Sequence, residues 1–597
     1  MVGHKAKTTI FGRLRDDRGG NVLAIMAAAM IPIIAMVGSG IDMTRAYMAQ
    51  NRFRQACDAG SLAGRRLLSG LAVTEAAREE AARYFAFNFP QGAFKSAPYT
   101  LTMTVPTAGT LKIATETTVP TTLMKMFGFD TLPVHAECAA TQDFINTDIM
   151  LVFDLSGSMN CAPGGSGDCG GIEASNSKIG ALRTAAISLY DTLEPAQTQL
   201  YENNLRLRYG FVNYNSSVNV GRLLYQKNPD WLVESATYRS RTPNWIDARA
   251  IFIGKSACEQ AYNDQLASKN GYTGFMGGWW LTGNNCQVIG QTKSLPSGYT
   301  YEPRTLDVRA HLASNLAATG ATNPVPIWPI IGTNAPNDDR PYIKTSIWNG
   351  CIEERQTNAT AIDGGNATAA PLDAYDLDID MIPNSDATRW KPMWGDIAWR
   401  GNNQQPDAPC PTEARRLRNY HQNRASFVDY VNGLRAQGNT YHDLGVIWGA
   451  RLISGTGIFR SSTPETNDIN DPDNPEKIRG FSVKKYMIFM TDGEMAPTTT
   501  VYSAYGIETL DRRVLANAGN NNTNLTRRHL QRFRMACNAA KSKGIDVWVI
   551  AFATKLTTDM ERCASKPDQA ASLSTNAALI AKFEEIGSKI GSLRLSE

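Results

Sequence analysis

The longest stretch without a charged side chain lies near the N-terminus and constrains the chain most. Gly19 to Ile41 reads GGNVLAIMAAAMIPIIAMVGSGI. A helix of about 20 apolar residues spans the hydrocarbon core of a bilayer. Five basic residues precede the stretch and favour a cytoplasmic N-terminus: Lys5, Lys7, Arg13, Arg15 and Arg18. We therefore predict a cytoplasmic basic tail (1–18), one transmembrane helix (19–41), and an extracytoplasmic remainder.

Two other interpretations of this stretch stay open. A cleaved signal peptide has a shorter apolar region, of about 7 to 15 residues. A buried core helix is rarely apolar on all sides over such a length. Pro32 does not argue against a membrane helix, because neighbouring groups in such helices tolerate proline.

Composition narrows the class of protein. The chain has 597 residues with 43% hydrophobic and 19% charged residues, which suits several folded domains. Its formal net charge is only +4, and no long basic run occurs, so a nucleic-acid partner is not expected. The ten cysteines include no CxxC pair, which argues against zinc ribbons and thioredoxin-like sites. In an oxidising compartment they would form disulfides. We favour Cys161–Cys169 and Cys351–Cys410, and a staple between Cys57 and Cys138 is plausible.

Residues 42–145 are expected to form helices followed by a small sheet. Strong helix formers dominate from Met43 to about Phe89, and Thr- and Val-rich segments with partial alternation follow from Tyr99 to Asp143.

Residues 146–597 show apolar strands alternating with helices, the pattern of a doubly wound α/β sheet. Strands are expected at 149–153, 205–214, 486–491 and 546–552, and helices at 177–193, 441–454, 526–543 and 576–591. Residues 222–410 interrupt the pattern with Asn, Asp, Pro and Gly, yet hold nine of the eleven tryptophans. Such an aromatic content predicts a folded insertion and not a flexible linker.

Oxygen-bearing side chains follow the first apolar strand, in the segment Asp154-Leu-Ser156-Gly-Ser158. A carboxylate and two hydroxyls at alternate positions past a strand end suit a hard divalent cation, and open α/β sheets bind ligands there. A polar strand-to-helix loop explains this short motif equally well. Thr440, at the start of an expected helix, and Asp492, at another strand end, add a hydroxyl and a carboxylate.

Taken together, DLSGSM, GNT and MTDGE resemble the metal-ion-dependent adhesion site of von Willebrand factor A (VWA) domains. The resemblance implies a Rossmann-like domain that binds a divalent cation, Mg²⁺ before Mn²⁺ or Ca²⁺. It implies the metal residues Asp154, Ser156, Ser158, Thr440 and Asp492, and a partner protein that donates an Asp or Glu carboxylate. The insertion lengthens the gap between Ser158 and Thr440, and it is expected near the metal.

The N-terminal segment, RGGNVLAIMAAAMIPIIAMVGSGIDMTRAY with QACDAGSLAG after it, resembles TadG-like proteins of the tight-adherence (Flp) pilus system. The segment from Trp348 to Arg355, WNGCIEER, is similar to theirs as well. The resemblance implies a non-enzymatic scaffold in pilus assembly and adhesion. It would lie in the inner membrane, contact pilus components and place most of the chain in the periplasm. The alternative is a surface VWA adhesin unrelated to pili.

Other motifs are weaker. No ATPase, nucleophile-elbow or metalloprotease motif supports a chelatase subunit or a hydrolase. Gly254-Lys255-Ser256 mimics a phosphate loop, but the first glycine of that motif is replaced by Arg249. His442 lies close to Thr440 in sequence and is considered as a ligand contact. Three aspartates, at 376, 378 and 380, would share one face of a strand, where we expect a solvated edge and keep a second cation site as the alternative.

Overall fold

The computed structural model describes residues 21–592 except 66, 69–72, 107–109, 142–144, 203, 254–276, 283–284, 310–311, 313–324, 328–343, 347, 403, 517–518 and 520. The basic tail and the motif at Gly254 lie outside the described residues. The chain divides into two units, which are described separately. Unit 1 ends at Phe144 and includes Arg479–Phe481, and unit 2 comprises Ile145–Ile478 and Ser482–Glu597.

Unit 1 combines two helices with a three-stranded antiparallel sheet of order β1-β2-β3. Its helix α2 is long and apolar enough to cross a membrane, judged by length and composition. The helices and strands expected from Met43 onward are confirmed. The elements are α2 (Asn21–Arg65), α3 (Glu75–Asn88), β1 (Thr102–Thr104), β2 (Thr110–Pro120) and β3 (Thr131–Thr141).

Small residues let the second half of α2 lie close to α3 and the sheet. A Cβ added at Gly64 would lie 2.6 Å from the Leu111 side chain and 2.7 Å from the Ala81 side chain. Aromatic rings fill the adjacent core, where Phe53 packs edge-on against Phe85. The Ala- and Gly-rich sequence of α2 is therefore a packing requirement of this unit.

A disulfide joins Cys57 of α2 to Cys138 of β3, across 81 residues of sequence. Replacing both cysteines by alanine is expected to lower the unfolding free energy of unit 1 by about 2 to 4 kcal/mol, because the unfolded chain gains freedom. Chemical denaturation followed by far-ultraviolet circular dichroism measures this change. A double variant with an unchanged denaturation midpoint would contradict the expectation.

Unit 2 is built on a mostly parallel sheet whose main path runs β13-β5-β4-β16-β19-β20, with the short β14 and β15 beside β16. The strands β5, β4, β16, β19 and β20 pair in parallel, and β13 is antiparallel at the edge. The sheet strands are β4 (Asn146–Asp154), β5 (Leu207–Tyr214), β13 (Arg415–Asn419), β14 (Glu465–Thr466), β15 (Lys477–Ile478), β16 (Phe481–Thr491), β19 (Ile545–Phe552) and β20 (Ala570–Leu573).

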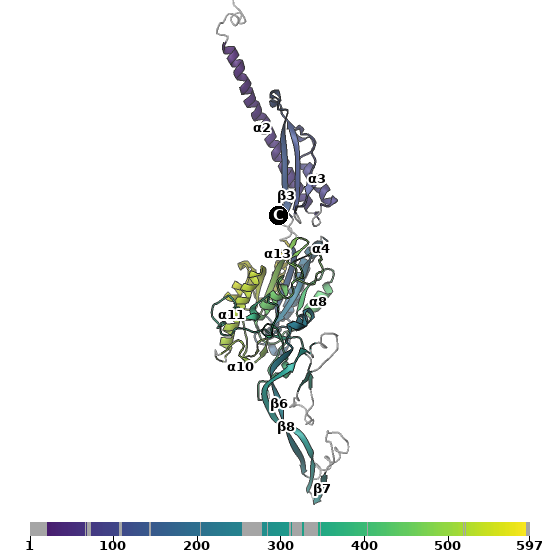
Figure 1. Cartoon of the computed structure of the whole chain (residues 1–597), viewed down its shortest axis with the longest axis vertical. Coiled ribbons are helices and arrows are strands. Elements are labelled where there is room, and N and C mark those ends of the chain that lie inside the picture. Colours follow the sequence, from purple (N-terminus) through teal and green to yellow (C-terminus); the bar gives the residue numbers. More distant parts are fainter. Residues whose placement is uncertain are drawn as a thin grey trace, which may run out of the picture. The chain divides into compact units, whose positions relative to one another are not determined.

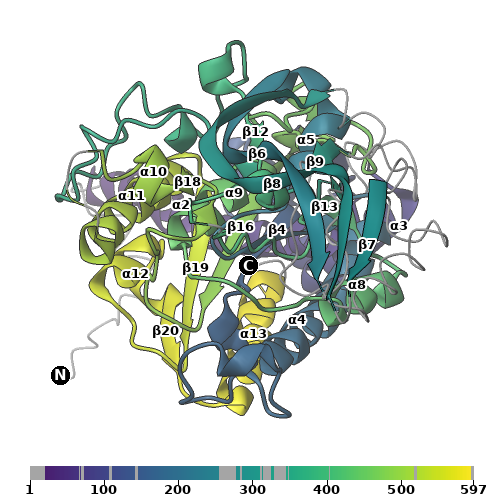
Figure 2. The same ribbon diagram turned by 90° about the horizontal axis from the view of Figure 1, so that it is seen from below.

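Helices cover both faces of this sheet, which makes it doubly wound. In Figure 2, α4 and α13 lie together on one side of the strands and α9 lies on the other. Tyr190 of α4 packs against Tyr209 of β5, with ring centroids 5.6 Å apart. The helices are α4 (Lys178–Glu202), α5 (Gly221–Lys227), α8 (Arg424–Asn432), α9 (His442–Ile453), α10 (Glu508–Asp511), α11 (Asn522–Ser542), α12 (Thr558–Cys563) and α13 (Asn576–Ser592).

The helix α9 approaches the sheet closely because glycines face it. A Cβ at Gly449 would lie 2.6 Å from the Val152 side chain, and one at Gly445 would lie 2.5 Å from the Tyr214 ring. Larger residues would push the helix outward. These contacts fix the N-terminal end of α9, and with it the loop that carries Thr440.

The described residues of the expected insertion include strands, and part of them joins the main core. Its strands β6 and β8 run side by side as a long antiparallel pair (Figure 1). Trp348, Trp390 and Trp394 are buried in the same hydrophobic cluster as α9 and α11. The other described strands of unit 2 are β6 (Ser235–Ile253), β7 (Gly277–Thr282), β8 (Asn285–Asp307), β9 (Val325–Ile327), β10 (Lys344–Ser346), β11 (Ile352–Glu353), β12 (Lys391–Pro392), β17 (Tyr502–Ser503) and β18 (Gly506–Ile507).

The expected cysteine pairs are confirmed where the structure describes them. Cys161 is bonded to Cys169, and Cys351 to Cys410. A further pair, between Cys537 at the end of α11 and Cys563 of α12, was not anticipated. The first two disulfides join segments with little regular structure, and the third joins the long helix α11 to the short helix α12.

Candidate functional site

Two neighbouring strand ends form the floor of the candidate site. The strands β4 and β16 are parallel, with Phe153 opposite Met490, so Asp154 and Thr491 end the strands side by side. Parallel strands bring their carboxyl ends to one edge of a sheet, where α/β proteins bind ligands. The side chain of Thr491 donates a hydrogen bond to Asp154 Oδ2 over 2.7 Å.

The five residues proposed from sequence come from three separate segments, and the structure brings them together. The Ser156 N–H donates to Asp154 Oδ1 over 2.8 Å, and the Ser156 and Ser158 hydroxyls lie 3.1 Å apart. Ser158 Oγ donates to Asp492 Oδ1 over 2.8 Å. This chain of contacts links both carboxylates through the two serines.

The third segment reaches the site through the loop before α9. The Gly157 N–H donates to the carbonyl of Gly438 over 2.9 Å, which ties this loop to the serine loop. A Cβ at Gly493 would lie 3.9 Å from both Ser158 Oγ and Thr440 Oγ1. The two hydroxyls therefore lie near the same backbone position, at ordinary contact distance from it.

These groups line an open cavity of about 1000 Å³. Ser156, Ser158, Thr440 and Asp492 are in its wall, and Asp154 is fully buried beneath them. The glycine-rich loop between Cys161 and Cys169 forms another side, and the last residues of the insertion, 407–409, form a third. The expectation that the insertion reaches the site is met at this edge.

Lys178, at the first position of α4, is a site residue that sequence reasoning missed. Its Nζ donates to Asp492 Oδ2 over 3.0 Å and to the Gly165 carbonyl over 3.2 Å, and its side chain is only 3% exposed. A cation in the first turn of a helix is unfavourable next to the positive end of the helix dipole. That mismatch was the available signal that Lys178 serves a nearby carboxylate.

The electrostatics of the site favour additional positive charge. Burial, and then the charge of Asp492, raise the pKa of Asp154 to about 7. Burial also raises the pKa of Asp492, against the opposing effect of Lys178. Two buried carboxylates share one neighbouring lysine, which contacts Asp492, so the site remains short of positive charge.

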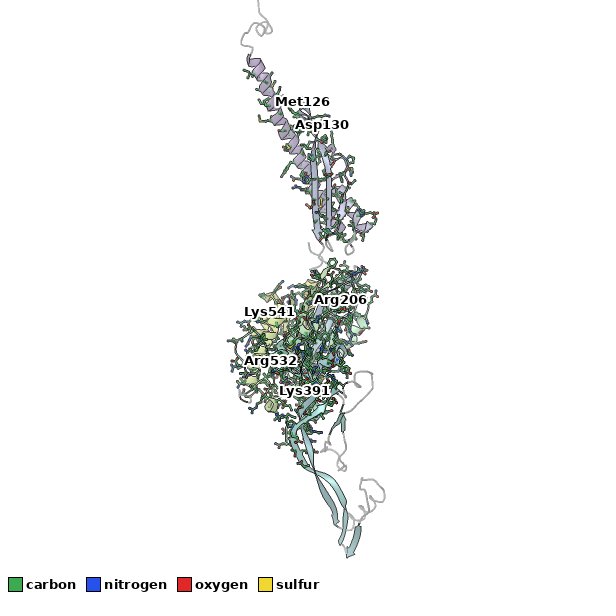
Figure 3. The ribbon with its side chains drawn as sticks, in the orientation of Figure 1. Met126, Asp130, Arg206, Lys391, Arg532 and Lys541 are labelled. Atoms are coloured by element: carbon green, nitrogen blue, oxygen red, sulfur yellow. A yellow bond between two sulfur atoms is a disulfide. The ribbon has the colours of Figure 1, made fainter. Side chains whose placement is uncertain are left out.

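Two weaker sequence hypotheses can be compared with the structure. His442 does not line the cavity: it is buried, with its Nε2 3.0 Å from Thr491 Oγ1, and burial lowers its pKa to about 3. The three aspartates share no strand: a short helical turn covers Tyr375–Leu377. Asp376 is buried against Arg532, which Figure 3 labels, whereas Asp380 accepts hydrogen bonds from Ser454 and Thr456. The alternate spacing would put the three aspartates on one face only in an extended strand, and this segment is not an extended strand.

Among the described residues, no cluster of three or more His, Cys, Asp or Glu side chains suits a metal ion. The candidate site combines two carboxylates with three hydroxyls. Such a set has fewer than three acidic, His or Cys side chains, but it presents the oxygen donors that Mg²⁺ prefers.

Comparison with known proteins gives one family. Residues 20–79 match the model of a family described as putative Flp pilus-assembly, TadE/G-like. The match covers α2 and the first residues of α3, and it confirms the resemblance of this segment. No curated protein sequence matches the chain significantly.

Solved structures with a distant likeness include three pilus proteins. The pilus adhesin SpaC from Lactobacillus rhamnosus GG is 10% identical, over 83% of this chain and 34% of that chain, with a TM-score of 0.28. The PilB minor pilin from Streptococcus sanguinis is 10% identical, over 83% of this chain and 78% of that chain, with a TM-score of 0.28. The vWF domain of the type V pili tip protein Mfa5 from Porphyromonas gingivalis is 9% identical, over 77% and 98%, with a TM-score of 0.26. The chain thus spans about a third of the length of the first of these adhesins.

Proposed function

We propose that this protein is a membrane-anchored, non-enzymatic binding component of Flp (Tad) pilus assembly and adhesion. Its unit 2 acts as a VWA-type domain that holds a divalent cation, most suitably Mg²⁺, at the end of β4. The observation that carries the proposal is the convergence of Asp154, Ser156, Ser158, Thr440 and Asp492 on one open cavity. The TadE/G-like match of residues 20–79 supports the pilus assignment.

The donor set fits a hard cation. The hydroxyls of Ser156, Ser158 and Thr440 supply neutral oxygens, and Asp154 and Asp492 supply negative charge. Burial raises the pKa of Asp154, and the positive charge of a bound cation would oppose this rise. A cation with few anionic ligands from the chain attracts a further carboxylate, which a partner protein supplies through the open side of the cavity.

We propose that this site lies outside the cytoplasm. In the proposed topology α2 crosses the inner membrane with the basic tail in the cytoplasm, and unit 2 lies in the periplasm. The disulfides of both units suit an oxidising compartment.

Photo-crosslinking tests the proposed binding role. A benzoylphenylalanine at Ser166, in the cavity wall, is expected to capture a pilus-system protein in Mg²⁺ and to lose it in EDTA. The matched position is Leu372, which is 98% exposed and does not line the cavity, and it should show no Mg²⁺-dependent product. Capture at Ser166 that ignores EDTA would overturn the metal-bridged mechanism. Capture of proteins unrelated to pili would favour a general surface adhesin.

Replacing Lys178 by methionine is expected to make the protein more responsive to Mg²⁺. The variant leaves the buried Asp492 carboxylate without its cation, so the metal-free protein should lose about 1 to 3 kcal/mol of stability. A divalent cation then restores the missing charge. Melting temperatures measured in EDTA and in Mg²⁺ should differ more for Lys178→Met than for the wild type. If Mg²⁺ raises the melting temperature of the variant no more than that of the wild type, Lys178 and the metal do not neutralise the same carboxylate, Asp492.

A further inference from the structure

The loop between β2 and β3 exposes large apolar side chains. Within residues 121–130, Met126 is 76% exposed, Phe129 56% and Phe127 36%. Exposed loops are normally polar, and a cluster of large apolar side chains at a tip marks a contact surface. The single basic residue of this segment, Lys125, is exposed as well.

This loop is fastened to the helix α2. The carboxylate of Asp42, which is only 3% exposed, accepts hydrogen bonds from the N–H groups of Thr122, Leu123 and Met124 over 2.8 to 2.9 Å. Leu123 packs directly on Gly38, where an added Cβ would lie 2.7 Å from the Leu123 Cβ. The position of the loop along α2 is therefore set by specific contacts.

The contact falls in the last turn of the apolar segment. Gly38 precedes the end of that segment, Ile41, by three residues, which is about 4.5 Å of helix. On the N-terminal side of Gly38 the side chains of α2 are bare: Ile33 is 54% exposed, Met36 70% and Val37 57%. In the proposed topology, the loop therefore lies beside α2 at the point where the helix would leave the hydrocarbon core.

We propose that this loop enters the same lipid bilayer that α2 crosses, with Met126, Phe127 and Phe129 among the upper acyl chains. Lys125 would extend its amine to the lipid phosphates, since long basic side chains place the charge at the interface. Figure 3 labels Met126 on this loop, next to the bare part of α2. The continuity of the two apolar surfaces identifies lipid as the occupant. The inference rests on the proposed membrane anchor, and it gives unit 1 a second membrane contact that resists rotation about α2.

Site-specific fluorescence in the full-length protein tests this inference. Phe129→Cys, labelled with nitrobenzoxadiazole, is reconstituted into vesicles of phosphatidylcholine and phosphatidylglycerol. The matched variant is Phe87→Cys, also an exposed phenylalanine (84%). It lies in α3, which packs through Phe85 on Phe53, about 22 Å farther along α2 than Gly38. Labelled wild type gives the background of the existing cysteines.

We expect the label at 129 to emit at shorter wavelength and to be quenched several-fold less by iodide than the label at 87. Lipids with a spin label on the upper acyl chain should quench the label at 129 alone. Equal iodide quenching at both positions would overturn the inference. So would protection of position 129 in native membranes but not in pure lipid vesicles, because the occupant would then be a protein.

A third variant, Met36→Cys, separates this inference from the anchor on which it rests. Its label should be inaccessible to iodide, since Met36 lies inside the apolar segment. Protection at 36 with free access at 129 would reject the loop insertion and leave the anchor intact. Free access at 36 would reject the anchor, and the loop insertion with it.

Discussion

Replacing Asp154 by asparagine is expected to reduce divalent-cation binding more than about 100-fold, since loss of even an outer partner of a metal ligand costs about 10- to 100-fold. The amide keeps an acceptor for the Thr491 hydroxyl and removes one of the two negative charges. Asparagine is a sharper test than alanine, because Asp154 is fully buried and alanine would leave its hydrogen-bond donors without a partner. Isothermal titration with Mg²⁺ and Mn²⁺ measures the change.

The matched control is Asp191→Asn, the same substitution at an exposed carboxylate that pairs only with the exposed Arg424. This control should bind cations like the wild type. EDTA should reproduce the Asp154→Asn result in the Ser166 crosslinking experiment. If Asp154→Asn and EDTA both leave cation binding and partner capture unchanged, the residues only cap a loop and the adhesion-site hypothesis is wrong.

Replacing Glu354 by alanine is expected to lower the stability of unit 2 by about 3 to 5 kcal/mol, the usual cost of breaking a buried ion pair from one side. Both Glu354 and Arg451 are fully buried, with Arg451 Nη1 3.0 Å from Glu354 Oε1. The carboxylate also accepts hydrogen bonds from the indole N–H groups of Trp390 and Trp448, over 3.2 and 2.5 Å. The variant would leave a buried guanidinium without its counter-ion and two buried indoles without this acceptor.

Urea denaturation followed by tryptophan fluorescence measures this loss. Glu354→Gln retains an acceptor for the indoles and should lose less than the alanine variant. The exposed ion pair between Asp191 and Arg424 offers a second comparison. Asp191→Ala should lower the unfolding free energy by less than about 1 kcal/mol. If Glu354→Ala costs no more than Asp191→Ala, this buried network does not stabilise the domain.

The sequence predicts the parts of the fold that follow from hydrophobic pattern. Each strand of the central sheet that is apolar along its length was anticipated, because a strand covered on both faces reads as a continuous apolar run. The edge strand β13 was missed. Its sequence, RRLRN, buries only Leu417, since charged side chains protect an exposed sheet edge.

The candidate site was predictable where a short motif carried it, as at Asp154, Ser156 and Ser158. The role of Lys178 was not, because it depends on a tertiary contact with Asp492, 314 residues away. The hypothesis that the aspartates at 376, 378 and 380 share one strand face was wrong for a related reason. Spacing fixes a shared face only when the backbone is extended, and here buried partners such as Arg532 bend the segment instead.

The pairing of β4 with β16 bears on how the protein matures. The contact between Asp154 and Thr491 spans 337 residues of chain. At synthesis rates of about 5 to 20 residues per second, β4 is made on the order of half a minute before β16 exists. Closing so long a loop is entropically unfavourable until the intervening segment has itself become compact. The cavity therefore cannot form before β16 has been made, and a chain that stalls before β16 lacks Asp492 and has no competent site.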